Sequence, residues 1–486
     1  MVSLFLAPIV FISCLEDTIE VQSFGSLSGT VIDSFTDQPI SDVEINTNPS
    51  SSVVFSDSLG NFQIPEIAAG EYTFTARSAG YEKAFVNATI TANSSTEVTI
   101  KMDQQFTVPS VVVNPLPQVG AKDQSRNLTL FWETSPALND TITYNIFVYE
   151  SNVDAVVFSS LNNPDTFLVL SDLRYETTYF WQVNVHSTTG GESNGEIWNF
   201  TTVDFPDNRF LFAANTTGNY QIYSSNDSAT QTIQITRAPV NSLHPLYNSD
   251  RSEIAFSANP TLNNQIFIMD YKGDNSRQVT TIPIAGFHGK GAEFCWWPDN
   301  GGFVYSHYDK LYSIDRHGSN LKLVSTALQG RNFGSCDYNG NTNKIVVQTV
   351  SSLIYEGEIY LMNPDGSDTL RIVDDLPGIV QNPTFSIDGK KVIYTQDVSG
   401  FDSPDGRQLD SRIFILDLAT MVATDISINK PDGTNDSQPR FSPFGSEIIF
   451  TNAPNDDSGV KSVFQMETDG TGRSLLFEDA EMPHWK

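Results

Sequence analysis

The sequence predicts an all-β protein: two small β-sandwiches followed by a six-bladed β-propeller that the C-terminal strand closes. Three observations lead to this fold class. Segments 25–102 and 107–203 carry short apolar strands that alternate with turn residues, which is typical of β-sandwiches. Segment 205–486 repeats a strand motif about every 40–50 residues, which is typical of propeller blades. Hydrophobic residues make up 39% of the 486 residues, so the chain has enough apolar material for packed cores.

The N-terminus carries an apolar run of signal-peptide length. Residues 1–13 read MVSLFLAPIVFIS, a run too short to span a bilayer as a helix of about 20 residues. The small residue before Cys14 resembles a bacterial lipoprotein cleavage site, which implies that this cysteine is the lipidated first residue of the mature protein. We therefore expect residues 1–14 to be a signal peptide with a lipobox, and Cys14 to be the lipidation site of an outer-membrane lipoprotein, periplasmic or surface-exposed. A plain secretory signal with an incidental cysteine is the alternative.

The charge of the chain argues against polyanionic partners. It has 58 acidic and 27 basic residues, a net charge of −31, and no basic tract. Such a chain is repelled by the phosphate backbone of nucleic acids and by anionic lipid. We expect no nucleic-acid partner, membrane association only through a lipid anchor, and a monomer that binds a protein or a glycan of the bacterial cell envelope.

Segment 25–102 contains a series of turn and strand motifs. In order, these are G-x-V-x-D (29–33), Q-P-I (38–40), D-x-x-G-x-F (57–62), G-x-Y-x-F (70–74) and a G-Y pair (80–81). The series resembles the carboxypeptidase regulatory-like domain, which implies a prealbumin-like sandwich that acts as a spacer or adhesive module, without peptidase activity. Carbohydrate binding here would need exposed aromatic residues on one face. Tyr81 and Phe85 are the candidates, although we expect both in the core.

Segment 107–203 predicts a second sandwich with aromatic strands. Its landmarks are an early Trp132, the pattern L-x-x-x-T-x-Y-x-W-x-V at 173–183, and the pattern W-x-F-x-T at 198–202. These resemble a fibronectin type III domain. We expect its tyrosines and tryptophans in the core, since buried aromatic residues are the default.

Two motifs repeat along segment 205–486. The first is an opening strand with a proline slot followed two residues later by an aromatic residue. Its copies are Pro245-Leu-Tyr247, Cys295-Trp-Trp297, Cys336-Asp-Tyr338, Pro383-Thr-Phe385, Pro439-Arg-Phe441 and Pro483-His-Trp485. The second, a hairpin motif, begins at Gln221-Ile-Tyr223 without an opening strand before it. The last opening strand supplies the missing one, so we expect the C-terminus to close the ring.

The repeats resemble those of a TolB-type propeller with WD40-like repeats, and residues 383–389, P-T-F-S-I-D-G, are the clearest copy. If that resemblance holds, the opening strands are innermost. Because side chains alternate between sheet faces, the residue between slot and aromatic faces away from the aromatic. The candidate binding residues for the propeller channel are Trp296, Asp337, Thr384, Arg440 and His484. Burying such polar groups unpaired is costly, and hydrogen bonds between blades are the favoured alternative to a ligand site.

No catalytic or metal-binding motif is found in the sequence. It lacks a G-x-S-x-G elbow, a P-loop and an HExxH pattern, so we expect no enzyme, no metal and no cofactor. The acidic loops at 432–436 and 455–457 lack the EF-hand pattern, and a Ca²⁺ ion there is the alternative to ordinary turns. Cys295 and Cys336 occupy the same slot of consecutive repeats. Since packed sheets lie about 10 Å apart, we expect two buried free thiols rather than a disulfide.

These observations predict a non-enzymatic, envelope-anchored lipoprotein whose propeller binds a protein or glycan partner, displayed on a two-domain stalk. The alternative is a carbohydrate-binding or polysaccharide-processing protein with its site in the propeller channel or on the first sandwich. Processing would need two carboxylates about 5–10 Å apart, which 58 acidic residues could supply.

Overall fold

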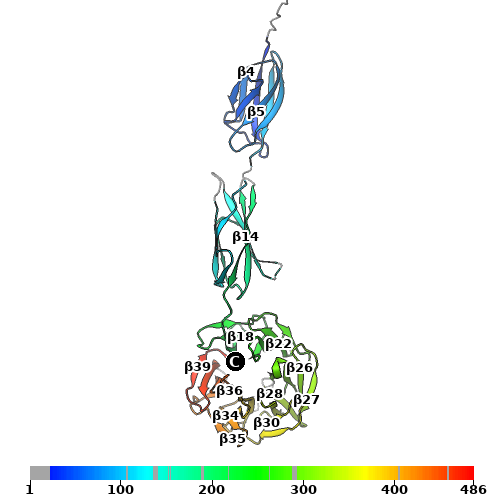
Figure 1. Cartoon of the computed structure of the whole chain (residues 1–486), viewed down its shortest axis with the longest axis vertical. Helices are drawn as coiled ribbons and strands as arrows, with labels where there is room; N and C mark the ends of the chain where they lie inside the picture. Colours follow the sequence, from blue (N-terminus) through cyan, green and yellow to red (C-terminus); the bar gives the residue numbers. More distant parts are fainter. Residues whose placement is uncertain are drawn as a thin grey trace, which may run out of the picture. The chain divides into compact units, whose positions relative to one another are not determined.

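The computed structural model describes residues 22–105, 108–134, 141–151, 153, 155–187, 191–216, 218–261, 263–286, 293–402, 406–456 and 459–486. It is an all-β structure with strands β1 to β40 and one short 3-10 turn, Pro298–Asn300 (Figure 1). The chain divides into two compact units, Met1–Asp204 (unit 1) and Phe205–Lys486 (unit 2). Within the described ranges, no helix has the length and apolar character that crossing a membrane requires. Cys14, the expected lipidation site, lies outside the described residues.

The first domain of unit 1 consists of two small sheets. One contains, in order, β4 (Asn61–Ala68), β1 (Phe24–Asp33) and β7 (Ser95–Met102), and the other contains β3 (Val53–Phe55), β2 (Glu44–Asn48), β5 (Gly70–Arg77) and β6 (Ala84–Ile90). Alternate residues of β1 and β5, such as Leu27, Val31 and Phe74, are fully buried in one core. This is the period-two pattern expected of sheets with one buried face.

Asp33, at the end of β1, connects three separate segments. One carboxylate oxygen accepts hydrogen bonds from the backbone N–H groups of Phe35 (3.0 Å) and Thr36 (2.8 Å). The other accepts from the Gln104 amide (2.7 Å) and the Tyr81 hydroxyl (3.1 Å). The Thr36 N–H and then the Gln104 amide hold the pKa of Asp33 well below its usual range. The aspartate of G-x-V-x-D and the tyrosine of the G-Y pair are therefore in direct contact.

Replacing Asp33 with asparagine should lower the melting temperature of the first domain, because an amide cannot accept all four of these hydrogen bonds. A carboxylate with a depressed pKa stabilises the fold above its unfolded pKa of about 3.9, and this contribution is lost as the pH falls further. The difference between wild type and Asp33→Asn should therefore shrink below about pH 4. Calorimetry over a pH series measures it. Asp37→Asn is the control, since Asp37 forms an exposed ion pair with Lys101, and an equal effect of both variants would contradict the prediction.

The second domain of unit 1 also has two sheets. One contains β13 (Phe167–Leu170), β10 (Leu128–Glu133) and β8 (Val113–Leu116). The other contains β12 (Val156–Asn163), β11 (Ile142–Glu150), β14 (Thr178–Ser187), β16 (Trp198–Thr202) and β9 (Ala121–Gln124), with β15 (Glu192–Asn194) beside β14. Trp132, Tyr179, Trp181 and Trp198 are each at most 3% exposed, which confirms that the aromatic landmarks form the core.

The described residues of unit 2 form six four-stranded antiparallel sheets around a common centre, the arrangement of a β-propeller (Figure 1). Blade 1 contains β17 (Phe210–Asn215), β18 (Tyr220–Ser225), β19 (Thr232–Gln234) and β40 (Glu481–Trp485); blade 2 contains β20 (Ser242–Tyr247), β21 (Glu253–Ala258), β22 (Gln265–Asp270) and β23 (Arg277–Gln278). Blade 3 contains β24 (Phe294–Trp296), β25 (Gly302–His307), β26 (Lys310–Asp315) and β27 (Lys322–Thr326); blade 4 contains β28 (Arg331–Asn339), β29 (Lys344–Ser351), β30 (Gly357–Met362) and β31 (Leu370–Val373). Blade 5 contains β32 (Val380–Phe385), β33 (Lys391–Asp397), β34 (Ser411–Asp417) and β35 (Val422–Asp425); blade 6 contains β36 (Thr434–Phe441), β37 (Glu447–Pro454), β38 (Ser462–Glu467) and β39 (Ser474–Phe477).

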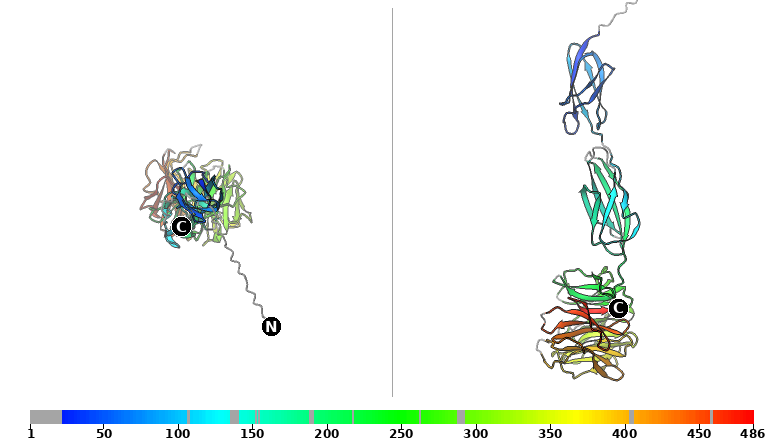
Figure 2. Two further views of the ribbon diagram at one scale, coloured as in Figure 1. Left: turned by 90° about the horizontal axis from the view of Figure 1, so that it is seen from above. Right: turned by 90° about the vertical axis from the view of Figure 1, so that its left-hand side faces the viewer.

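The C-terminal strand completes blade 1, as the offset of the repeats predicts. β40 pairs antiparallel with β17, so that Phe210 faces Trp485 and Leu211 faces His484. Figure 2 shows this strand, in red, beside the green strands of blade 1. β40 also contacts β20 and β36, the opening strands of the blades on either side. Closure removes the two open sheet edges that an incomplete ring would expose.

A tight turn after the third strand of a blade packs against the blade before it. In blade 4, Gly366 has φ 81° and lies at this turn. A Cβ atom built on Gly366 would lie 2.0 Å from the carbonyl oxygen of Val324 in blade 3. Three other blades place a left-handed glycine in the same way, Gly273, Gly318 and Gly470. Glycine at this turn therefore sets how closely consecutive blades approach.

Gly366→Ala should destabilise unit 2 by about 3 kcal/mol. The left-handed conformation costs an L-residue about 1–2 kcal/mol, and the clash with backbone adds about 1–3 kcal/mol. Gly330→Ala is the matched control, because Gly330 has φ 83° but a Cβ there would meet nothing within 4 Å. We expect Gly330→Ala to show the conformational cost alone in denaturant unfolding. Equal losses for the two variants would mean that the blades can move apart freely at this turn.

Candidate functional site

A β-bulge precedes the proline slot on the innermost strands. The register shifts between Leu243 and Leu246 on β20, and equivalent shifts occur on β28, β32, β36 and β40. On four of these strands the residue before the proline has a left-handed backbone, with φ between 51° and 57°: His244, Asn382, Gln438 and Met482. Non-glycine residues in this conformation cost energy and cluster at ligand sites and switches. These four positions are therefore candidates for a ligand site.

All four residues line one cavity in the channel, together with Glu293, Thr384 and Arg440 and parts of the proline slots. The volume that water can occupy in this cavity is about 20 Å³. About 10–15 Å³ by this measure is what one water needs. The channel cavity as it stands holds about one water and not an organic ligand.

A buried carboxylate, that of Glu293, lines this cavity and contacts residues of two other blades. Glu293 is 6% exposed and precedes β24 of blade 3. Its Oε1 accepts a hydrogen bond from the amide of Asn382 on blade 5, at 3.1 Å, and lies 3.6 Å from Nδ1 of His244 on blade 2. The contact with Asn382 therefore bypasses blade 4 and joins two blades that are not adjacent in the ring. Such a satisfied polar group stabilises a single arrangement of the blades.

The five expected binding residues lie on the innermost strands, but only two of them line the channel cavity. Thr384 and Arg440 line the channel cavity. Four of the five use their side chains to bond the backbone of a neighbouring innermost strand. Two of these side chains donate: Trp296 Nε1 to the Leu246 carbonyl (3.2 Å) and Thr384 Oγ1 to the Pro439 carbonyl (3.1 Å). The other two accept: Asp337 Oδ2 from the Phe385 N–H (2.9 Å) and His484 Nδ1 from the Tyr247 N–H (3.2 Å). These are the inter-blade hydrogen bonds that the sequence favoured.

Burial shifts the pKa values of two of the residues that form these inter-blade hydrogen bonds, His484 and Asp337. Burial, aided by the charges of Arg440 and Lys486, lowers the pKa of His484 well below its usual value. The imidazole is therefore neutral at neutral pH, and its Nδ1 can accept the Tyr247 N–H. Burial also raises the pKa of Asp337, although the positive charge of Arg440 opposes this.

Sequence reasoning missed His244, Glu293, Asn382, Gln438 and Met482. Four of these directly precede a proline slot. In a pleated strand, the residues before and after the slot share one face, so the same alternation could have identified them. No such signal marks Glu293, because it lies two residues before the slot cysteine and outside strand β24.

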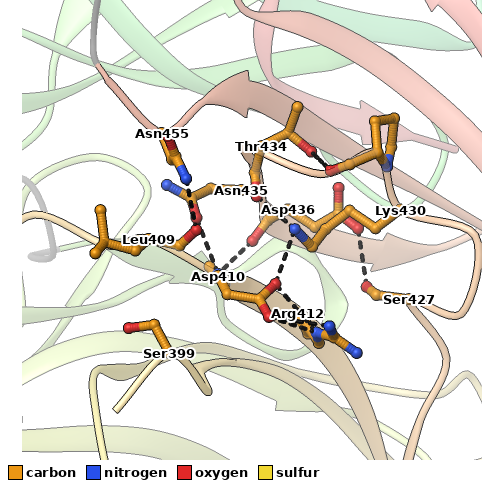
Figure 3. Close-up of polar contacts among 12 residues, drawn as sticks. Ser399, Leu409, Asp410, Arg412, Ser427, Lys430, Thr434, Asn435, Asp436 and Asn455 are labelled. Carbon is orange, nitrogen blue, oxygen red and sulfur yellow. Dashed lines mark hydrogen bonds and ion pairs between the residues drawn. The ribbon is translucent and has the colours of Figure 1, made fainter. Parts of the chain in front are cut away.

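A dense polar cluster lies at blades 5 and 6 (Figure 3). Asp410 forms ion pairs with Arg412 (2.9 Å) and with Lys430 (2.9 Å), whose side chain is only 5% exposed. Burial opposes ionisation, but hydrogen bonds from Arg412 and Lys430 hold the pKa of Asp410 below its usual range. Asp436, from one of the acidic loops considered for Ca²⁺, pairs with Arg473 instead. Across the described part of the chain, no group of three or more His, Cys, Asp or Glu side chains could hold a metal ion.

Cys295 and Cys336 are both free and buried, as expected. Their Sγ atoms are 3.6 Å apart, so the two thiols are in contact without a disulfide bond. The innermost strands of blades 3 and 4 approach much more closely here than the roughly 10 Å spacing of packed sheets. The convergence of blades toward the axis explains the difference.

On the first domain, the two aromatic candidates have different environments. Tyr81 packs against the core and donates to Asp33, in line with the core expectation. Phe85 is 66% exposed on β6, so its expected core position is wrong.

Residues 26–103 match the family model of the carboxypeptidase regulatory-like domain. This match confirms the resemblance on which segment 25–102 was interpreted. The regulatory-like domain of this chain includes Asp33 and Tyr81, the two motif residues that the structure joins by a hydrogen bond.

Three solved structures show similarity to the chain. TolB from Acinetobacter baumannii is 16% identical with a TM-score of 0.46, over 64% of this chain and 79% of that one. A putative TolB from Agrobacterium tumefaciens is 15% identical with a TM-score of 0.42, over 56% and 90%. An oligogalacturonate lyase from Vibrio parahaemolyticus is 11% identical with a TM-score of 0.36, over 56% and 72%. Similarity of this degree carries no function from one protein to another.

Proposed function

We propose that this protein is a non-enzymatic, envelope-anchored lipoprotein whose six-bladed, TolB-like propeller binds a protein or glycan partner. The observation that carries the proposal is the narrow channel: inter-blade hydrogen bonds engage the side chains of Trp296, Asp337, Thr384 and His484, and the channel cavity has room for about one water. A ring held this way is a rigid support for its surface loops. Loops on rigid scaffolds commonly carry recognition.

The two domains of unit 1 would serve as the stalk. Two structural features of the second domain support its assignment as a fibronectin type III domain, in addition to the sequence landmarks. β8, β10 and β13 form one sheet and β11, β14 and β16 belong to the other. The backbone N–H of Arg174 also donates to the Tyr179 hydroxyl at 2.9 Å, the hydrogen bond of a tyrosine corner. Both features support this finer assignment.

The competing function is polysaccharide processing in the channel. That chemistry needs two carboxylates about 5–10 Å apart and room for a sugar ring between them. Glu293 is the one carboxylate among the described residues that line the channel cavity. The small volume and the single acid favour binding over hydrolysis.

The anchor is tested at Cys14. If Cys14 is lipidated, Cys14→Ala should move the protein from the membrane fraction to the soluble fraction. Mass spectrometry of the mature N-terminus identifies the lipid directly. An unchanged membrane fraction, or a mature protein that begins elsewhere, would disprove the anchor.

The binding role is tested by comparing the full chain with a chain that ends at residue 204. We expect the full chain to capture a partner from envelope extract, the shorter chain to lose it, and neither to release reducing ends from envelope polysaccharides. Capture by both chains would place binding on unit 1. Release of reducing ends by the full chain alone would establish an enzyme instead.

A further inference from the structure

Unit 2 contains a wider cleft whose lining shares no residue with the channel cavity. It lies between segment 205–208, the turn 250–252, and the side chains of Tyr247 and Tyr271. The volume that water can occupy in this cleft is about 360 Å³, compared with about 20 Å³ in the channel cavity. Sites for small organic ligands occupy roughly 300–1,000 Å³. The cleft, unlike the channel, therefore has room for such a ligand.

Aromatic side chains form much of its wall. The rings of Phe205 and Tyr271 meet edge to face, with centroids 5.4 Å apart. The buried Tyr247 donates its hydroxyl to the Asn208 carbonyl at 3.0 Å, which holds segment 205–208 against blade 2. Aromatic faces carry negative charge density and attract weakly positive C–H groups. One face of a sugar ring presents such groups.

An ion pair supplies hydrogen-bonding groups at the cleft. Arg251 NH1 donates to Asp207 Oδ1 at 2.5 Å, and the Arg251 and Asp207 side chains are 30% and 79% exposed. A surface pair of this kind adds little to stability. It does fix a carboxylate acceptor beside a guanidinium with five N–H donors. Adjacent sugar hydroxyls, each both donor and acceptor, complement this arrangement.

The charged groups around the cleft balance one another, and the net charge of the whole protein disfavours acidic ligands. Asp207 and Arg251 balance each other. The hydroxyl and N–H of Ser252 lower the pKa of Asp250, so this second carboxylate stays ionised at neutral pH. The ammonium of Lys272 lies 5.6 Å from the Tyr271 ring centroid, so two carboxylates and two cations balance around the cleft, in a protein whose net charge is −31.

We propose that this cleft binds a neutral saccharide, with a sugar face on Tyr271 and adjacent hydroxyls on Asp207 and Arg251. The inference deepens the proposed function, because it assumes that unit 2 acts in recognition and names the ligand class and its site.

The test is affinity electrophoresis of the full chain through gels that contain galactomannan, xyloglucan, laminarin or polygalacturonate. At least one of the three neutral polysaccharides should retard the wild type, and polygalacturonate should not. Tyr271→Ala and Arg251→Gln should each weaken the retardation about tenfold, a loss of about 1.4 kcal/mol. Lys344→Gln is the matched control, because it removes another exposed ion pair of unit 2, with Asp368, and should bind like wild type.

Calorimetry shows whether each variant folds. If Tyr271→Ala does not fold, Arg251→Gln alone tests the proposal. The proposal is overturned if no neutral polysaccharide retards the wild type, if polygalacturonate retards it more strongly, or if the folded cleft variants bind like wild type. Capture of an envelope partner by unit 2 is measured on the same variants. If capture survives while saccharide retardation is absent, the cleft inference fails and the proposed function stands.

Discussion

Deleting Met482–Lys486 should lower the stability of unit 2 by at least about 4 kcal/mol. The deletion removes Trp485, whose ring packs on Phe210 with centroids 4.7 Å apart, and burial of such a ring is worth about 3 kcal/mol. It also removes the His484 acceptor for the Tyr247 N–H, which adds about 1 kcal/mol. The remaining pairing of β40 with β17 is lost as well, so this figure is a lower bound.

Calorimetry of the full chain measures the effect, with the transitions of unit 1 as an internal reference. Lys486→Ala is the control, because the backbone N–H of Lys486 that bonds Arg209 is kept and β40 ends at Trp485. The deleted protein should also associate, since β17 becomes an open sheet edge. A deletion variant that melts like wild type and stays monomeric would disprove closure by the C-terminal strand.

Closure was predictable because it depends on counting repeats. An opening strand is recognised by its proline slot and aromatic residue, and the sixth copy, Pro483-His-Trp485, follows the last hairpin motif. The core aromatics of the second domain were predictable for a similar reason, since Tyr179 and Trp181 alternate on one strand. Both inferences use periodic patterns, which can be recognised in the sequence without knowing which distant residues are in contact.

The contents of the channel were not predictable in full, because they depend on contacts between residues far apart in the sequence. Glu293 and Asn382 are bonded across the ring, and nothing local marks Glu293 as the partner. The thiols of Cys295 and Cys336 illustrate the same limit: a mean sheet spacing of about 10 Å does not apply to the innermost strands, where blades converge. Phe85 illustrates a further limit. The alternation of side chains places Phe85 on one face of its sheet but does not show whether other residues cover that face.

Proline accounts for four of the five bulges on the innermost strands, since the slot of β28 holds Cys336. Proline has no N–H for the ladder, so within sheets it is confined to edges and bulges. Each innermost strand is the inner edge of its blade, and Pro245, Pro383, Pro439 and Pro483 all follow a left-handed residue there. The residue before each proline is thereby turned toward the channel cavity. Three of the polar side chains that line the channel cavity, those of His244, Asn382 and Gln438, thus come from residues that precede prolines.

Arg473→Met should destabilise unit 2 by about 3–5 kcal/mol, because it leaves a buried carboxylate without its cation. Asp436 is 0% exposed, and Arg473 donates to both of its oxygens, at 2.9 and 2.7 Å. The guanidinium also lies 4.6 Å and 5.0 Å from the ring centroids of Phe450 and Phe464. Methionine keeps much of this packing, so the measured loss reports mainly on the charge.

Two controls separate charge from packing in chemical unfolding experiments. Lys344→Met removes the exposed pair with Asp368 and should cost less than about 1 kcal/mol. The double variant Asp436→Asn/Arg473→Met removes both charges and should recover most of the loss, since the asparagine can still bond Ser427 and Asn452. If the double variant is as unstable as Arg473→Met alone, Arg473 stabilises blade 6 through its contacts with the two phenylalanine rings. If Arg473→Met costs no more than Lys344→Met, water reaches Asp436 and the polar cluster of blades 5 and 6 is not a buried one.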